Sequence, residues 1–245
     1  MKNWHGQDSD KTLDDNEIHI WLNYLNLHQA RLKHLYPLLS DAEKERSERF
    51  KHYKHRKNYI ASHGFLHTVL NYYIDIPASE ITFSHGEQGK PSIIAEQNAE
   101  NIQFNLSHSG NLAILVICKK HQLGVDIEHT DRKADWAGIA RRFFTENEQQ
   151  HFFRLEESTQ EDAFYKIWTR KEAHMKVTGE GLHLPPTQFE ISIPPKPAAF
   201  IRNLQSADNN YYKMLDIDLP DIYNDYHASL SASFDFKALK SFIHS

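Results

Sequence analysis

The sequence lacks several features that would assign it to a common class of protein. A single cysteine, Cys118, lies in an apolar run and excludes an intrachain disulfide. No apolar run is long enough to cross a bilayer, and the first residues lack the apolar core of a signal peptide. The net charge of -5 lacks the basic excess of a general nucleic-acid-binding protein. We therefore expect a cytoplasmic protein that binds neither membranes nor nucleic acid.

The composition is that of an ordinary globular protein, with 40% hydrophobic and 25% charged residues. A chain of 245 residues can form one large domain or two of ordinary size, each with a real core. No repeat, low-complexity tract or linker separates independent domains. Residues 1–16 are polar, and we expect them to form a flexible N-terminal tail.

The stretch from Phe164 to Leu182 predicts a helix that carries charge on its buried side. At about 100° per residue its apolar side chains form one stripe, and Gly179 provides a stop. Lys171 projects from the middle of this stripe, with Glu172 and Lys176 beside it. Because an unpaired charge against a protein core is unfavourable, we expect something charged to face this side of the helix.

A second group of charges lies in Gly124 to Glu128, where apolar and acidic residues alternate. As a strand, this segment puts Asp126 and Glu128 on one face, which is either exposed to solvent or functional. Two carboxylates at this spacing repel each other, and a nearby Glu172 would increase the repulsion unless a cation is bound. Carboxylates without cysteine or an obvious histidine set indicate a hard ion such as Mg²⁺.

A basic helical region follows Ser40, which has the capping-box spacing to Glu43. Its cations form either a solvated face balanced by glutamates or a phosphate-binding cluster; they are Lys44, Arg46, Arg49, Lys51, Lys54, Arg56 and Lys57. His63 and His67 have the i, i+4 spacing of two metal ligands. No third ligand or catalytic glutamate accompanies them, so a zinc site is not favoured.

The remaining segments predict turns and short strands. Gly89 to Pro91 predicts a tight turn and lacks the glycine spacing of a P-loop. Ser107 and His108 fall in a turn-rich pentad between two predicted strands, where they are either solvated or able to bind an anion. A helical region is expected over 135–154, and strands are expected over 17–22, 102–106, 112–118, 189–193, 211–217 and 226–234.

Five motifs in order, GKP, FNLSHSG, GVDIE, RFF and WTRKEAHMKVTGEGL, resemble the 4'-phosphopantetheinyl transferases. The specific part is the pair G-x-D-x-E and W-x-x-K-E-A-x-x-K, about forty residues apart. The chain is similar to the long, single-chain type of this family, represented by the surfactin-synthetase activator. The resemblance extends from about Ile18 to Phe189.

The resemblance implies an α+β fold of two similar α+β halves related by a pseudo-twofold axis, each with a long helix on a small antiparallel sheet. Residues 17–122 would form one half and residues 123–245 the other, with coenzyme A bound in the cleft between them. The implied reaction transfers 4'-phosphopantetheine from coenzyme A to a serine of an apo acyl or peptidyl carrier protein and releases 3',5'-ADP. The carrier would come from fatty acid, polyketide, polyunsaturated lipid or nonribosomal peptide synthesis, and a single chain with both halves favours a monomer.

The charged residues suit this reaction, which requires charge neutralisation and an aligned nucleophile. Asp126, Glu128 and Glu172 would hold Mg²⁺ against the pyrophosphate. Glu172, directly or through a metal-bound water, is the candidate base for the serine proton. Lys171 and Lys176 would neutralise the phosphates, and Lys176 could donate to the leaving nucleotide.

By the family's pattern, a second set of residues binds the nucleotide end of coenzyme A. Glycine, lysine and proline of the GKP motif would line the adenine, and the others would contact the 3'-phosphate; the set is Gly89, Lys90, Pro91, Ser107, His108, Arg46 and Lys44. An arginine common in the family aligns with Asn58, with Arg56 and Lys57 nearby, which leaves that contact open. Glu148 matches a family acidic residue to which we assign no role.

Two other functions are compatible with the same residues. Three carboxylates with nearby lysines also describe a Mg²⁺-dependent nuclease or phosphohydrolase, although no basic, aromatic-interleaved track for a nucleic-acid strand is present. A non-catalytic carrier-protein or nucleotide-binding module is the second alternative, and it would have no need to keep the charge cluster. Because carrier proteins are acidic around the modified serine, the transferase hypothesis also predicts a mixed apolar and basic docking surface.

Overall fold

The computed structural model describes residues 4–6, 9–87, 89–130, 135–179, 184–205 and 211–244. The chain divides into two compact units. One contains residues 121–236 and is called here the inserted unit; the other combines residues 3–120 with residues 237–245 and is called the flanking unit. Residues 237–244, expected in the second half, instead pack in the flanking unit. Both units mix helices and strands, so the fold class is α+β.

Among its described residues, the flanking unit contains three α-helices and a five-stranded sheet with the strand order β1-β12-β2-β6-β5. Its elements are α1 (Gln29–Leu35), α2 (Asp41–Glu48), α3 (Tyr53–Leu70), β1 (Trp4–Gly6), β2 (Glu17–Tyr24), β3 (Phe83–His85), β4 (Pro91–Ile93), β5 (Ile102–Ser109), β6 (Leu112–Lys119) and β12 (Ala238–His244). Strands β2, β6 and β5 are antiparallel neighbours, as expected for a hairpin. The sheet is mixed because β12 joins it parallel to β2.

The N-terminal segment differs from the flexible tail expected for residues 1–16. Strand β1 pairs in parallel with β12 through residues 241–243, and the Leu13 side chain is buried. The cause is the free edge of β12, which offers unpaired backbone groups that a short strand can satisfy. Residues 1–3, 7 and 8 lie outside the described part of the chain.

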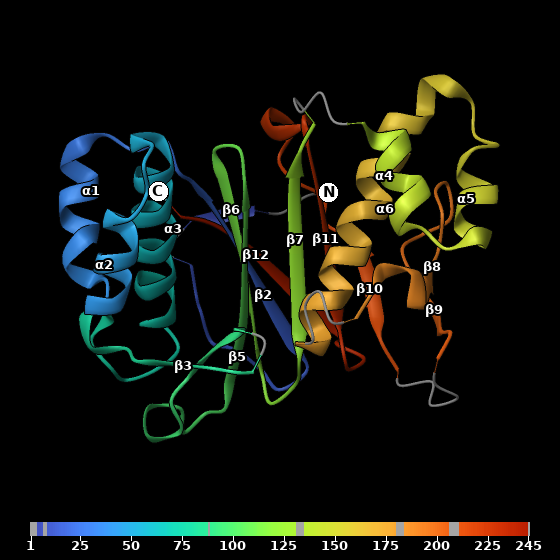
Figure 1. The fold of residues 1–245 in the computed structure, drawn as a ribbon. Coiled ribbons are helices and arrows are strands. Elements are labelled where there is room, and N and C mark those ends of the chain that lie inside the picture. Colours follow the sequence, from blue (N-terminus) through green and yellow to red (C-terminus); the bar gives the residue numbers. More distant parts are fainter. Residues whose placement is uncertain are drawn as a thin grey trace. The chain divides into compact units, whose positions relative to one another are not determined.

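The basic helical region is divided into α2 and α3, which lie beside α1 (Figure 1). The predicted capping box at Ser40 is confirmed, because Ser40 Oγ accepts from the Glu43 backbone N–H while the Glu43 carboxylate accepts from the Ser40 N–H. On its inner side α3 buries Phe65 and Leu66 in one hydrophobic core with Trp21 of β2. This packing fixes α3 against the sheet and leaves polar side chains of α2 and α3 facing each other.

The inserted unit contains a three-stranded antiparallel sheet with the order β10-β11-β7, on which α6 packs (Figure 1). Its elements are β7 (Leu123–His129), α4 (Trp136–Phe143), α5 (Glu146–Phe152), α6 (Glu157–Thr178), β8 (Phe189–Ile191), β9 (Phe200–Asn203), β10 (Lys213–Asp216) and β11 (Tyr226–Ala232). The predicted strand at GVDIE is confirmed as part of β7. The helical region expected over 135–154 is two helices, because Thr145 caps a new helix with its hydroxyl. Among the described residues, none of the helices has the length and apolar run that a membrane span needs.

Strand β7 approaches α6 so closely that only glycine fits at position 124. A Cβ built on Gly124 would lie 2.3 Å from the carbonyl oxygen of Ala173 and 2.6 Å from the backbone nitrogen of Val177. Both of these are backbone atoms of α6, which cannot move aside as a flexible side chain can. The close approach therefore sets the depth at which the acidic residues of β7 meet the charged residues of α6.

We expect Gly124→Ala to destabilise the protein by about 1–3 kcal/mol, because the added methyl group forces β7 and α6 apart. The measurement is the free energy of unfolding from urea denaturation followed by circular dichroism. Gly6→Ala is the matched control, since a Cβ on Gly6 has no atom within 4 Å. Equal denaturation midpoints for Gly124→Ala and Gly6→Ala would show that β7 and α6 can move apart at no cost in stability.

Candidate functional site

Helix α6 presents the motif charges in two different directions. It ends where the sequence predicted, because Gly179 adopts a left-handed conformation with φ of 71° that favours glycine. Glu172 and Lys176 are four residues apart and share one side of the helix, whereas Lys171 is rotated by about 100° from Glu172. Leu182, which ended the predicted stretch, lies outside the described residues.

An acidic cluster, defined here as Asp126, Glu128 and Glu172, forms where β7 meets α6. Asp126 is buried, and its Oδ1 lies 2.7 Å from Nζ of Lys176, which also donates to the Val125 carbonyl at 3.1 Å. Burial raises the pKa of Glu172 to about 7, with a further contribution from the Asp126 charge that Lys176 partly offsets. The charge of Glu128 makes a smaller contribution that also raises the pKa of Glu172. The cluster therefore carries more negative charge than one lysine neutralises.

The donor types of the acidic cluster fit a hard divalent cation. Carboxylate oxygens are the ligands that Mg²⁺ takes in proteins, and an added cation would relieve the repulsion that raises the pKa of Glu172. Within the described part of the chain, no group of three His, Cys, Asp or Glu side chains has the ready spacing of an assembled metal site. Lys176 instead holds Asp126 in an ion pair, so metal binding requires this lysine to share or release the carboxylate.

Lys171 does not join the acidic cluster, contrary to its expected role in neutralising phosphates. Its side chain is fully buried, and Nζ lies 2.8 Å from the Glu148 carboxylate. Nζ also donates to the carbonyl oxygens of Pro186 at 2.7 Å and Phe189 at 3.0 Å. Since an ammonium group has three N–H donors, these contacts use all of them. Lys171 is therefore a structural residue in this molecule.

Glu148, to which we assigned no role from the sequence, is the partner of Lys171 and joins three elements. One carboxylate oxygen accepts from the backbone N–H of Thr145 at 2.8 Å as part of the α5 capping box. The other accepts from the backbone N–H of Ile191 in β8 at 2.9 Å. With the ion pair to α6, this one side chain connects α5, β8 and α6, and it positions the helix that carries Glu172.

A pocket of about 480 Å³ lies within the flanking unit and gathers four of the residues predicted to bind the nucleotide. These four are Arg46, Gly89, Pro91 and His108. The other described lining residues are Ser40, Ala42, Glu43, Tyr59, His63, Leu66, Thr82, Phe83, His85, Asn105 and Leu106. One arginine and three histidines against a single carboxylate, with an apolar wall, suit an anion that carries an aromatic ring.

Three further predicted residues are not among the described residues that line this pocket. Lys44 makes an exposed ion pair with Asp41 at 3.3 Å. Lys90 is half-buried, and burial lowers the pKa of its ammonium group to about 8. Ser107 is buried in β5, because this strand continues through Ser109 where the sequence predicted a loop.

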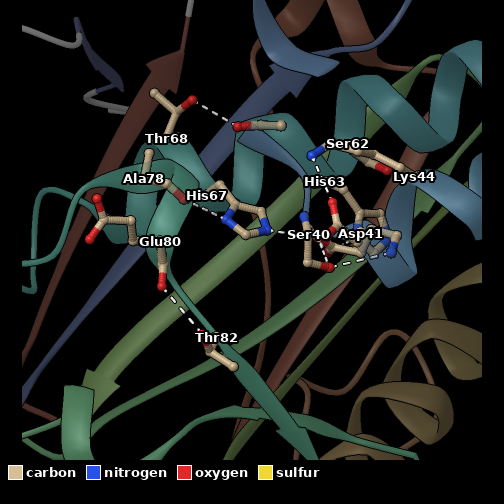
Figure 2. A network of polar contacts seen from close by, with 12 residues as sticks. Ser40, Asp41, Lys44, Ser62, His63, His67, Thr68, Ala78, Glu80 and Thr82 are labelled. Carbon is tan, nitrogen blue, oxygen red and sulfur yellow. Dashed lines mark hydrogen bonds and ion pairs between the residues drawn. The ribbon is translucent and has the colours of Figure 1, made fainter. Parts of the chain in front are cut away.

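Sequence reasoning missed the polar network that forms one wall of the pocket. Glu43 of α2 contacts both histidines of α3: its Oε1 lies 2.6 Å from His63 Nδ1 and its Oε2 lies 2.9 Å from His67 Nε2. Figure 2 shows His67 beside Ala78, whose carbonyl oxygen lies 2.7 Å from His67 Nδ1. The two histidines at i, i+4 therefore share Glu43 as a hydrogen-bond partner.

Comparison with known proteins agrees with this architecture. Residues 122–231 match the model of the 4'-phosphopantetheinyl transferase superfamily, and residues 26–120 match that of the 4'-phosphopantetheinyl transferase N-terminal domain. The chain is 32% identical to the 4'-phosphopantetheinyl transferase HetI of Nostoc sp., over 83% of this chain and 84% of the relative. It therefore belongs to the 4'-phosphopantetheinyl transferase superfamily.

Within the superfamily, the chain is of the long, single-chain type. It is 29% identical to the 4'-phosphopantetheinyl transferase Sfp of Bacillus subtilis, over 78% of this chain and 83% of the relative. Both family models match within one polypeptide, the first in the inserted unit and the second in the flanking unit.

Proposed function

We propose that this protein transfers 4'-phosphopantetheine from coenzyme A to a serine hydroxyl of an apo acyl or peptidyl carrier protein and releases 3',5'-ADP. The observation that carries the proposal is the acidic cluster with Lys176, which lies on the motif pair that characterises the family. A buried carboxylate whose pKa is raised to about 7 beside two further carboxylates is a costly arrangement without a functional reason.

Each charged residue of the cluster has a distinct task in this reaction. Asp126, Glu128 and Glu172 would hold Mg²⁺, which when bound stabilises the charge that develops on the pyrophosphate. Glu172 accepts the serine proton, directly or through a water. Lys176 donates an N–H to a phosphate oxygen of the leaving nucleotide. To do so, it gives up its ion pair with Asp126. Lys171 takes no part in these steps.

The pocket in the flanking unit would bind the nucleotide end of coenzyme A. Pro91, Phe83 and Leu106 offer an apolar wall for adenine, and Arg46 and His108 offer cationic groups for the 3'-phosphate. Because all of these side chains belong to the flanking unit, their part in binding can be tested separately from the acidic cluster. We further propose that the protein acts as a monomer in the cytoplasm, since one chain contains both parts of the family pattern.

The experiment is intact mass spectrometry of an apo acyl carrier protein incubated with this protein, coenzyme A and Mg²⁺. We expect a mass gain equal to one phosphopantetheine group, absent when a chelator replaces Mg²⁺ and absent when the carrier's modified serine is alanine. Peptidyl and polyketide carrier proteins tested in parallel would identify the class of partner. Absence of a gain with every carrier would contradict the proposal and favour a binding module, and release of nucleotides from DNA or RNA would favour a nuclease.

A further inference from the structure

The hydrogen bonds around Glu43 determine its charge state. Its Oε2 accepts from the Ser40 backbone N–H and from the Ser40 hydroxyl, both at 2.8 Å. A backbone N–H can only donate, so this oxygen acts as an acceptor. Burial alone would raise the pKa of Glu43, but the hydrogen bonds from His63 and His67 outweigh it and lower the pKa. Glu43 is therefore an ionised carboxylate.

His67 is the second histidine partner of Glu43, and its side chain is fully buried. Its Nδ1 faces the Ala78 carbonyl, which can only accept a hydrogen bond, so Nδ1 carries a proton. Its Nε2 lies 2.9 Å from Oε2 of the Glu43 carboxylate, while Oε1 of the same carboxylate lies 2.6 Å from His63 Nδ1 and accepts its N–H.

His63 differs from His67 because its side chain lines the pocket. Its ring is held at the edge by Glu43 and on the face by Tyr59, whose ring centroid is 3.9 Å away at an interplanar angle of 26°. Its side chain is 25% exposed, and no described residue makes a hydrogen bond to its Nε2. The imidazole is therefore fixed in place through Nδ1 and its ring face, while Nε2 has no partner among the described residues.

We propose that His63 is an anion-binding residue of this pocket, whose Nε2 takes up a proton from solvent and donates it in a hydrogen bond to a phosphate oxygen of the bound nucleotide. Glu43 and Tyr59 act as positioning residues for the ring. The inference rests on the proposed function for the identity of the nucleotide. It goes beyond that function by making donor binding a proton-linked step, governed by a residue outside the motifs of the family.

Other charged and titratable groups surround His63 and set the field around it. They come from each element packed against it and from the facing strands: Glu43 and Arg46 from α2, Tyr59 and His67 from α3, His85 from β3 and His108 from β5. Glu43 places negative charge next to His63, whereas Arg46 places positive charge on the same pocket. A phosphate dianion in the pocket would shift this balance towards the imidazolium, so binding should take up a proton.

The test is isothermal titration calorimetry of the full-length protein with 3',5'-ADP, in buffers of different ionisation enthalpy at neutral pH. The variant His63→Asn places an amide N–H where Nδ1 was, so it can keep the contact with Glu43 but has no group at the Nε2 position. We expect it to bind about tenfold to a hundredfold more weakly than the wild type and to lose proton uptake. The control variant is His85→Asn, because His85 lines the same pocket but is not held by Glu43. This variant should retain proton uptake.

A pH series separates a binding role for His63 from a structural one. The nucleotide phosphate itself titrates near pH 6, so the informative quantity is the ratio of wild-type to His63→Asn affinity at each pH. This ratio should fall as the pH rises through the range in which histidine side chains lose their proton. A ratio that stays constant with pH would overturn the inference.

A second variant guards against a folding defect in the first. His63→Gln reaches the Nε2 position with an uncharged N–H, so it should restore part of the affinity without proton uptake. Unchanged affinity and unchanged proton uptake in both variants would overturn the inference. Carrier modification under the earlier mass assay would in that case still support the transferase. If 3',5'-ADP does not bind while the carrier is modified, the inference fails and the proposed function stands.

Discussion

Asp126→Asn is expected to lower the rate of carrier modification by about a thousandfold or more. The substitution keeps the size of the side chain but removes one of the three charges that would hold Mg²⁺. A metal ion contributes several kcal/mol of charge stabilisation in such reactions, and each 1.36 kcal/mol corresponds to about a factor of ten in rate. The rate is to be measured by the mass assay at saturating coenzyme A and carrier, so that the loss reports on the transfer step.

A matched control separates the metal role from general effects on the inserted unit. The control is Asp162→Asn. Asp162 lies on α6, and its exposed carboxylate pairs with Lys166 at 2.8 Å. We expect this variant to keep its rate within about twofold, because an exposed ion pair contributes little. Thermal melting of both variants checks that they fold. Retention by Asp126→Asn of more than a tenth of the wild-type rate would show that Asp126 does not hold a required metal.

The second large effect is expected on stability, from the buried pair of Lys171 and Glu148. Glu148→Ala should destabilise the protein by about 3–5 kcal/mol, because it leaves a buried ammonium group without its counter-charge. It also removes the acceptor for two backbone N–H groups, at Thr145 and Ile191. In a thermal melt followed by circular dichroism, this loss corresponds to a decrease in Tm of about 10 °C for a chain of this size.

Lys171→Met distinguishes a structural lysine from one that binds phosphate. Its unfolding midpoint should fall, while the KM for coenzyme A, measured at a temperature where the variant is folded, should stay within about twofold of the wild type. The double variant Glu148→Leu with Lys171→Met should be less destabilised than the sum of the single changes, since neither charge remains unpaired. A normal Tm with a strongly raised KM for Lys171→Met would restore the phosphate-binding role predicted from the sequence.

The contrast between Lys171 and Lys176 shows how far the sequence could predict the site. Helical periodicity located both lysines on a side that faces protein, and the pattern of β7 predicted which acidic residues share a face. Periodicity could not identify the partners of Lys171, because the carbonyls of Pro186 and Phe189 and the carboxylate of Glu148 come from two other segments of the chain. The ion pair of Lys176 with Asp126 depends on the depth at which β7 meets α6, which Gly124 sets.

The fold shows the same division between local and long-range information. The capping box at Ser40, the stop at Gly179 and the strand at GVDIE were predicted because each depends on neighbouring residues. The contacts of Glu43 with His63 and His67 span at least twenty residues, so their sequence positions alone could not reveal them. Strand β12 escaped prediction for a similar reason, because its stability comes from pairing with β1 and β2.

The position of β12 has a consequence for any fragment of this protein. The chain leaves the flanking unit at residue 120 and returns to it at residue 237, and its last strand lies between β1 and β2 in the sheet. A polypeptide that stopped after residue 120 would contain all of the residues that match the N-terminal family model and still lack an inner strand of the sheet. Its β2 would become an open edge with unpaired backbone groups and the exposed face of Trp21, which favours aggregation. The two family segments are therefore not two modules that gene fusion could join or separate at a single point.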